Sequence, residues 1–176
     1  MDLDFLLVYS KITEIDFYIS IHCSVMPENI ELKQALKDAK NFQLNVLNYL
    51  NEKYPSIHFS EQKVTIKKII NKKGNIKELE YKFDYVSADK KFMGDAKFLK
   101  NIPEPAAKYD NISKYVWLLQ NSDAQIKFLI FGRDKEVPER YLKRFEPLIK
   151  DVEFYFFNNE SLVPLGDNND VKLLTK

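Results

Sequence analysis

The feature of the sequence that most limits the fold is the apolar run QIKFLIF at residues 125–131. A continuous apolar run is typical of a strand in the middle of a sheet that is covered on both faces. Apolar residues at helical spacing over residues 106–121 and 138–148 predict helices on either side of this strand in the chain. We therefore expect an α/β fold in which helices flank a mixed central sheet.

Further elements are predicted before and after this centre. Pro27 suits the first turn of a helix and Tyr54-Pro55 ends one, so we expect a helix at about residues 28–53. Residues 57–70 and the run VEFYFF at 152–157 are predicted strands. Together with the hairpin described below, the expected order is α-β-β-β-α-β-α-β.

Length and composition predict a single domain over residues 1–176, with 45% hydrophobic residues available for its core. Residues 1–26 are interpreted as an N-terminal extension that packs on the core edge or serves a dimer contact, and residues 158–176 as a polar C-terminal tail. The single cysteine, Cys23, excludes an intrachain disulfide and indicates a reducing compartment. The acidic start lacks the basic residues of a signal peptide, and the apolar run at 5–9 is too short to span a bilayer. These features predict a cytoplasmic protein with no membrane partner.

The segment 81–99, YKFDYVSADKKFMGDAKFL, predicts two short strands joined by a polar turn. A turn centred between residues 89 and 90 places Asp84 directly opposite Asp95. Because side chains alternate between faces with a period of two, Lys97 shares the face of Asp95. That face also takes Lys82, and the other face takes an apolar set: Phe83, Tyr85, Phe92, Ala96 and Phe98.

Opposed carboxylates are a poor choice for stability, because like charges directly opposite destabilise a strand pair. Two carboxylates a few ångströms apart favour a cation or a proton between them, and oxygen ligands favour a hard divalent ion such as Mg²⁺. A neighbouring lysine suits a negatively charged substrate. This combination is a site for phosphodiester hydrolysis. The alternative is a surface hairpin whose Asp and Lys side chains pair in water and contribute little.

Asp84, followed by Asp95-Ala96-Lys97 on the next strand, resembles the PD-(D/E)xK nuclease superfamily of restriction enzymes and Holliday-junction resolvases. The resemblance covers residues 28–157 and implies a restriction-endonuclease-like core. It departs from the usual pattern in that Phe83, and not proline, precedes Asp84. The resemblance implies an endonuclease that uses Mg²⁺ or Mn²⁺. Asp84, Asp95 and the Ala96 carbonyl would bind the metal, and Lys97 would act on the attacking water.

The first helix of this superfamily often contributes a Glu to the metal site. That position corresponds to Gln43, a neutral residue, and Glu31 is a candidate if the helix lies differently. The plain alternative for Gln43 is a polar helix residue without a role in the site.

The net charge of +1 excludes a polycation, so a nucleic-acid surface has to come from locally clustered basic residues. Lysines adjoin the hairpin and continue into the following helix, where some relatives place a residue near the phosphate. Their alternative role is a solvated edge strand protected from aggregation. The candidates for contact with DNA are Lys67, Lys68, Lys72, Lys73, Lys100, Lys108 and Lys114.

Two wider alternatives stay open. A homodimer would supply the two sites needed to cut both strands of a duplex. The fold can also be a catalytically inactive module that binds nucleic acid or a protein partner, and the neutral Gln43 favours that interpretation.

Overall fold

The computed structural model describes residues 30–70, 74, 76–100 and 106–166. The chain divides into two compact units, residues 1–37 and 38–176, and the boundary falls within helix α2 (Ile30–Lys53). The larger unit contains every strand in the described ranges. The predicted extension at residues 1–26 lies outside the described residues, and a single domain over the whole chain stays a prediction.

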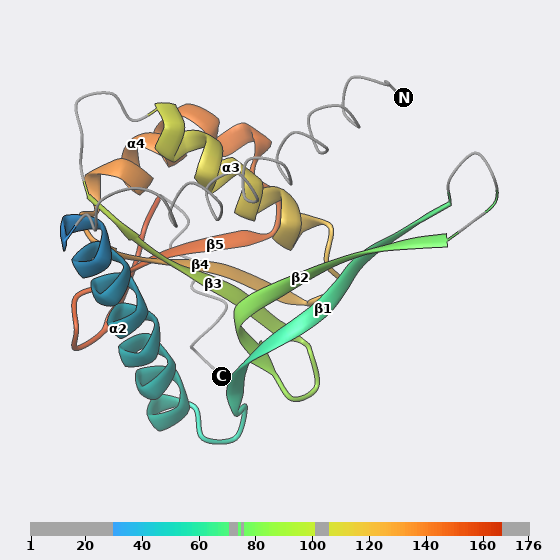
Figure 1. The fold of residues 1–176 in the computed structure, drawn as a ribbon, viewed down its shortest axis with the longest axis horizontal. Coiled ribbons are helices and arrows are strands. Elements are labelled where there is room, and N and C mark those ends of the chain that lie inside the picture. Colours follow the sequence, from blue (N-terminus) through green and yellow to red (C-terminus); the bar gives the residue numbers. More distant parts are fainter. Residues whose placement is uncertain (1–29, 71–73, 75, 101–105, 167–176) are drawn as a thin grey trace. The chain divides into compact units, whose positions relative to one another are not determined.

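The larger unit is built on one mixed sheet whose strands lie in sequence order (Figure 1). The first three strands are antiparallel, the third to fifth are parallel, and the last is antiparallel to the fifth. This confirms the predicted α/β class with a mixed central sheet. The strands are β1 (Phe59–Ile70), β2 (Ile76–Ser87), β3 (Phe92–Leu99), β4 (Ile126–Arg133), β5 (Val152–Phe157) and β6 (Leu162–Pro164).

Helices cover both faces of this sheet, as the apolar run at 125–131 predicted (Figure 1). One face packs against α3 (Ala106–Gln120) and α4 (Glu136–Phe145), which a short 3-10 helix, η1 (Glu146–Leu148), follows. The other face packs against α2. Alternate residues of β4 are buried in the two separate cores. The core under α3 and α4 includes Leu129, Phe131, Ile112, Val116 and Val137, and the core under α2 includes Phe128, Ile130, Phe42, Val46 and Leu50.

The expected element order is observed, with one addition. The helix α2 ends at Lys53, immediately before Tyr54-Pro55, because the residue before a proline is disfavoured in a helix. The strand β6 lies within residues 158–176, which were wrongly expected to be a tail throughout. It pairs with β5 and so covers an edge that would otherwise be unpaired. No helix in the described ranges is both long and apolar enough to cross a membrane.

The sheet is narrowly joined between its second and third strands. The strands β1 and β2 pair over nearly their whole length, with register shifts at two places. By contrast, β2 and β3 share only the pairs Tyr85 with Gly94 and Val86 with Met93. The strands β1 and β2 therefore continue beyond the rest of the sheet as a two-stranded ribbon (Figure 1).

Candidate active site

The hairpin between β2 and β3 has the register that its turn predicted. Tyr85 pairs with Gly94, which places Asp84 and Asp95 next in the same register. The turn is closed by a hydrogen bond from the Lys90 N–H to the Ser87 carbonyl. Ladder pairing between the strands stops before the two aspartates, so the carboxylates lie where β2 and β3 separate.

A β-bulge at this point changes which residues share a face. Ser60 pairs with Val86 and Gln62 with Phe83, so β2 has one residue more than β1 between these pairs. As a result Phe83 packs under α3 and α4, whereas Tyr85 packs under α2. The prediction that Phe83 shares the apolar face of the hairpin was therefore wrong. The rest of that set was placed correctly, since the α2 core also contains Phe92, Ala96 and Phe98.

Asp84 is half-buried and is held from two directions. Its Oδ2 accepts a hydrogen bond from the Ala96 N–H at 2.9 Å and another from the Gln43 side-chain amide at 3.2 Å. The backbone carbonyl of Gln43 in turn accepts a hydrogen bond from the Tyr85 hydroxyl at 3.1 Å, which joins α2 to β2. The helix position predicted from the resemblance thus lies beside the first aspartate.

Asp95 is the buried member of the pair, with 1% of the residue exposed. Its Oδ1 lies 3.2 Å from Lys97 Nζ and accepts the Ala96 N–H at 3.1 Å. Its Oδ2 accepts a hydrogen bond from the Tyr81 hydroxyl at 3.2 Å. Burial raises the pKa of the Asp95 carboxyl well above its usual value; the Lys97 charge opposes this rise, and a hydrogen bond and repulsion from Asp84 add to it. Both carboxyl groups accept the Ala96 N–H, so they lie next to each other.

Lys97 lies between this carboxylate and an aromatic ring. Its side chain is 12% exposed, and Nζ lies 3.3 Å from the centre of the Tyr115 ring. The rings of Tyr115 and Tyr81 are 5.9 Å apart. Burial, followed by the charge of Asp95 and the neighbouring Tyr115, raises the pKa of the Tyr81 hydroxyl. Both tyrosines belong to the site.

These two tyrosines were missed by the sequence interpretation. Simple alternation along β2 puts Tyr81 on the face opposite to the aspartates, and the bulge reverses that assignment. Helical spacing over residues 106–121 alone gives no sign that the Tyr115 ring lies over an ammonium group. Lys82, expected on the face of the aspartates, is exposed and forms an ion pair with Glu61.

The other predicted site residues are more dispersed. Glu31 is exposed in the first turn of α2 and belongs to the smaller unit. Lys67 and Lys100 are exposed, while Lys108 and Lys114 are half-buried on α3. Lys114 lies near the site, with its Nζ 5.9 Å from the Tyr115 ring centre. The side chain of Lys68, and Lys72 and Lys73 entirely, lie outside the described residues.

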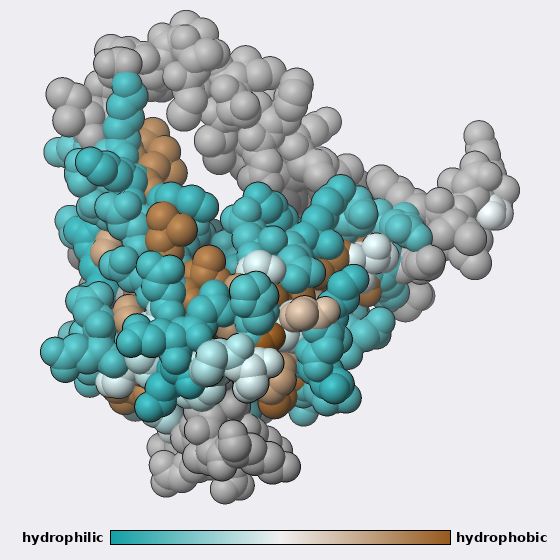
Figure 2. All heavy atoms as spheres, turned by 90° about the horizontal axis from the view of Figure 1, so that it is seen from below, coloured by the Kyte–Doolittle hydropathy of each residue, from teal (hydrophilic) through white to brown (hydrophobic). Residues whose placement is uncertain are grey.

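The surface near the ribbon has mixed charge. Lys63 of β1 forms an ion pair with Glu80 of β2 at 2.5 Å, and Lys82 is paired as described. The face of the molecule in Figure 2 is mainly hydrophilic, with hydrophobic residues in separate places. The described part of the ribbon thus offers a polyanion alternating charges and not a continuous basic strip.

The two aspartates carry donor atoms of the kind that could hold a hard divalent cation. The Asp84 and Asp95 carboxylates supply oxygen ligands, and their mutual repulsion is the kind that a cation relieves. The N–H and C=O of one strand residue point to the same edge, so the Ala96 carbonyl faces β2 together with its N–H. No group of three or more His, Cys, Asp or Glu side chains that could hold a metal ion occurs within the described ranges. A cation here would therefore depend on two carboxylates, a carbonyl and water.

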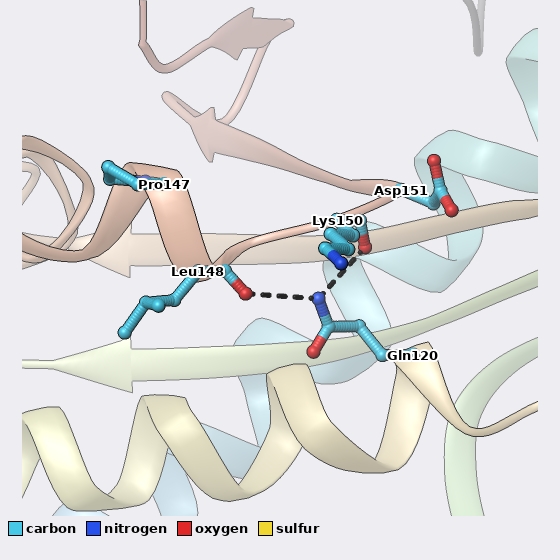
Figure 3. A pocket seen from close by; sticks show the side chains of 5 residues that line it. All are labelled: Gln120, Pro147, Leu148, Lys150 and Asp151. Atoms are coloured by element: carbon cyan, nitrogen blue, oxygen red, sulfur yellow. Dashed lines mark hydrogen bonds between the residues drawn. The ribbon is translucent and has the colours of Figure 1, made fainter.

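A surface hollow of about 560 Å³ lies elsewhere and contains none of these residues. It is lined by Gln120, Pro147, Leu148, Lys150 and Asp151 (Figure 3). The Gln120 amide donates to the carbonyls of Leu148 and Lys150 at 3.4 and 3.1 Å. These hydrogen bonds attach the end of η1 and the loop that follows it to α3.

No family model, no curated protein and no solved structure matches this chain. What the Asp84–Asp95 pair can do therefore follows from its own geometry and chemistry.

Proposed function

We propose that the protein is a metal-dependent endonuclease that hydrolyses DNA phosphodiester bonds, with Asp84, Asp95 and Lys97 at its active site. The observation that carries this proposal is the convergence of two carboxylates and one ammonium where β2 and β3 separate. Both carboxylates accept the same Ala96 N–H, and Lys97 Nζ lies 3.2 Å from Asp95. A restriction-endonuclease-like core and a DNA substrate belong to the same proposal.

Asp84, Asp95 and the Ala96 carbonyl would hold Mg²⁺ or Mn²⁺. When bound, such an ion would polarise a phosphate oxygen and lower the pKa of a water molecule. The chain's own groups prepare the site for this chemistry. The Gln43 side-chain amide donates a hydrogen bond to one oxygen of the Asp84 carboxylate. Asp84 is more exposed than Asp95, so the substrate approaches the pair from the side of Asp84.

Lys97 is the residue that acts on the reacting groups. An ammonium next to the pair attracts the phosphate and offsets the charge that accumulates on it during attack. Water attacks phosphorus in line with the leaving oxygen, so one P–O bond forms as another breaks; the water loses its proton to solvent, and the leaving oxygen takes up a proton from solvent. Lys97 orients this water and stabilises the hydroxide that attacks.

The test is plasmid cleavage with Mg²⁺ or Mn²⁺ by wild type, Asp84→Asn, Asp95→Asn and Lys97→Met. We expect each site variant to lose activity on the order of 100-fold or more. Asp123→Asn is the control, because Asp123 is an exposed aspartate in the loop between α3 and β4, away from the hairpin. Full activity in Asp95→Asn or Lys97→Met would contradict the site assignment.

A second function, a catalytically inactive module that binds nucleic acid or protein, has one observation in its favour. Asp95 is almost fully buried, and both of its oxygens already accept from protein groups. Thermal melting with added Mg²⁺ or Mn²⁺ separates the two functions. A bound cation stabilises by about 2.7 kcal/mol at a hundred times its Kd, and the nuclease function requires this rise and its loss in Asp84→Asn. An unchanged melting temperature favours the inactive module.

A further inference from the structure

The contacts around Asp95 form a closed cycle of four side chains. Asp95 Oδ1 contacts Lys97, and Lys97 lies over the face of Tyr115. Tyr115 neighbours Tyr81, whose hydroxyl returns to Asp95 Oδ2. This cycle of contacts joins three elements, β2, β3 and α3, on the face of the sheet under α3.

The helix α3 presents Tyr115 because of its position in the helical repeat. Ile112 and Leu119, which are both buried, lie three residues before and four residues after it, on the same helical face. The Tyr115 ring thus extends the buried stripe of α3 to the point where Lys97 emerges from β3. At 3.3 Å from the ring centre, the Lys97 ammonium is in close cation–π contact.

This contact removes most of the freedom of a side chain that is normally flexible. A lysine has a four-carbon stem with many rotamers, and its ammonium is a point charge without a preferred direction. With a carboxylate on one side and an aromatic face on the other, Nζ keeps a single position beside the aspartates. Tyr81 fixes the orientation of the Asp95 carboxylate in the same way, through its second oxygen.

We propose that Tyr115 and Tyr81 are positioning residues of the site, which hold the Lys97 ammonium and the Asp95 carboxylate in register with the reacting phosphate. This inference rests on the proposed nuclease function. It assigns no contact between either tyrosine and the substrate. The two residues act through Lys97 and Asp95, and their removal therefore affects the rate of the bound complex more than the binding of DNA.

The kinetic test compares Tyr115→Leu with Tyr115→Phe. Leucine removes the aromatic face, whereas phenylalanine keeps it and removes only the hydroxyl. We expect Tyr115→Leu to lower kcat about 10- to 100-fold with little change in KM for duplex DNA, and Tyr115→Phe to lose severalfold less. Tyr81→Phe, which keeps the ring and loses the hydrogen bond to Asp95, should lower kcat in the same range.

Tyr109→Leu is the matched control. Tyr109 is another half-buried tyrosine of α3, and its ring contacts Tyr141 and Phe145 in place of the site. Its variant should lose stability to a similar extent while keeping kcat. If Tyr109→Leu and Tyr115→Leu lose kcat equally, the effect is general to α3 and the positioning role is overturned.

A measurement on Lys97 tests the contact independently of catalysis. In protein labelled with ¹³C-lysine, the ε-methylene protons of Lys97 should be shifted upfield by the Tyr115 ring current, with assignment by Lys97→Arg. The shift should persist in Tyr115→Phe and vanish in Tyr115→Leu. If it is identical in all three proteins, the ring does not hold the ammonium and the inference is refuted.

The two proposals fail in distinguishable ways. If wild-type protein cuts no DNA with either metal, the nuclease function and the catalytic role of the tyrosines are both refuted. If wild type is active and Tyr115→Leu keeps full kcat, only the positioning role is refuted.

Discussion

Replacing Gly94 with alanine should strain the centre of the sheet. A Cβ at this position would lie 2.2, 2.4 and 2.6 Å from three atoms of the Phe128 ring. Ordinary contacts between carbon atoms are about 3.5–4.0 Å, so the new methyl group overlaps the ring by more than about 1 Å. Phe128 is the register partner of Gly94 on β4, which explains why its ring covers the glycine. The missing side chain of Gly94 thus makes room for the Phe128 ring.

Neighbouring side chains confine the Phe128 ring. Phe128 is fully buried, its ring is stacked on Tyr85 at 6.2 Å, and it meets the edge of Phe59 at 6.1 Å. Overpacking of a well-packed core costs about 1–3 kcal/mol, and this confinement places Gly94→Ala near the upper end. For a protein of this size, about 3 kcal/mol corresponds to a fall in Tm of roughly 6–12 °C.

The assay is a double-mutant cycle measured by urea unfolding of Gly94→Ala, Phe128→Leu and the double variant. The smaller leucine leaves room for the methyl group, so the double variant should be more stable than the sum of the two single changes predicts. We expect a coupling energy of about 1 kcal/mol or more, against an additive error of about 0.3–0.5 kcal/mol. The control pair is Gly74→Ala with Phe128→Leu: the positive φ of Gly74, 78°, makes its replacement destabilising by itself, but the added Cβ meets no atom within 4 Å, so these two effects should add. Additive effects of Gly94→Ala and Phe128→Leu would refute the reasoning.

Three further predictions concern the site and its support. Because burial raises the pKa of the Asp95 carboxyl, this group keeps its proton in the folded protein at pH values above 3.8 at which the unfolded chain has lost it. Without metal, the stability should therefore fall as pH rises from 3.8 through the folded-state pKa. Melting across pH should show this slope, and Asp95→Asn should flatten it. Asn51→Ala should cost about 1–3 kcal/mol, because the Asn51 amide bonds both the N–H and the carbonyl of Phe59, at 2.7 and 3.0 Å, while Asn48→Ala at an exposed position of the same helix should be nearly neutral in urea unfolding. Gln43→Glu adds a third carboxylate to the pair, so calorimetric titration should show tighter Mg²⁺ binding, and an equal or weaker affinity would place Gln43 outside the ligand set.

Much of the fold could be predicted because local patterns and tertiary packing agree in it. The apolar run at β4 is buried on both faces, and the turn at residues 87–91 has polar side chains that hold it. The Ser87 hydroxyl and the Lys91 N–H both donate to the Asp89 carboxylate, at 2.7 and 3.1 Å. These contacts lower the pKa of Asp89 to about 2. A turn of this kind fixes the register of its hairpin, and so Asp84 and Asp95 could be placed together.

The surroundings of the pair could not be predicted, because a bulge is a tertiary event. One extra residue at Asp84–Tyr85 reverses the faces of the residues before it, which brings Tyr81 to Asp95 and moves Phe83 to the other core. No residue in this stretch is a glycine that would mark the bulge. The contact between Tyr115 and Lys97 joins a helix to a strand, so its two residues share no sequence spacing.

The short junction between β2 and β3 has a mechanical consequence. Asp84 belongs to β2 and Asp95 to β3, and the backbone ladder between these strands has only two residue pairs within the described ranges. A small rotation about that junction would change the separation of the carboxylates, and the two cores resist it because each contains residues of both β2 and β4. A ligand that binds both carboxylates also couples the two strands, so its free energy of binding resists their rotation. The stiffness of this junction and the affinity of the site for such a ligand are then linked.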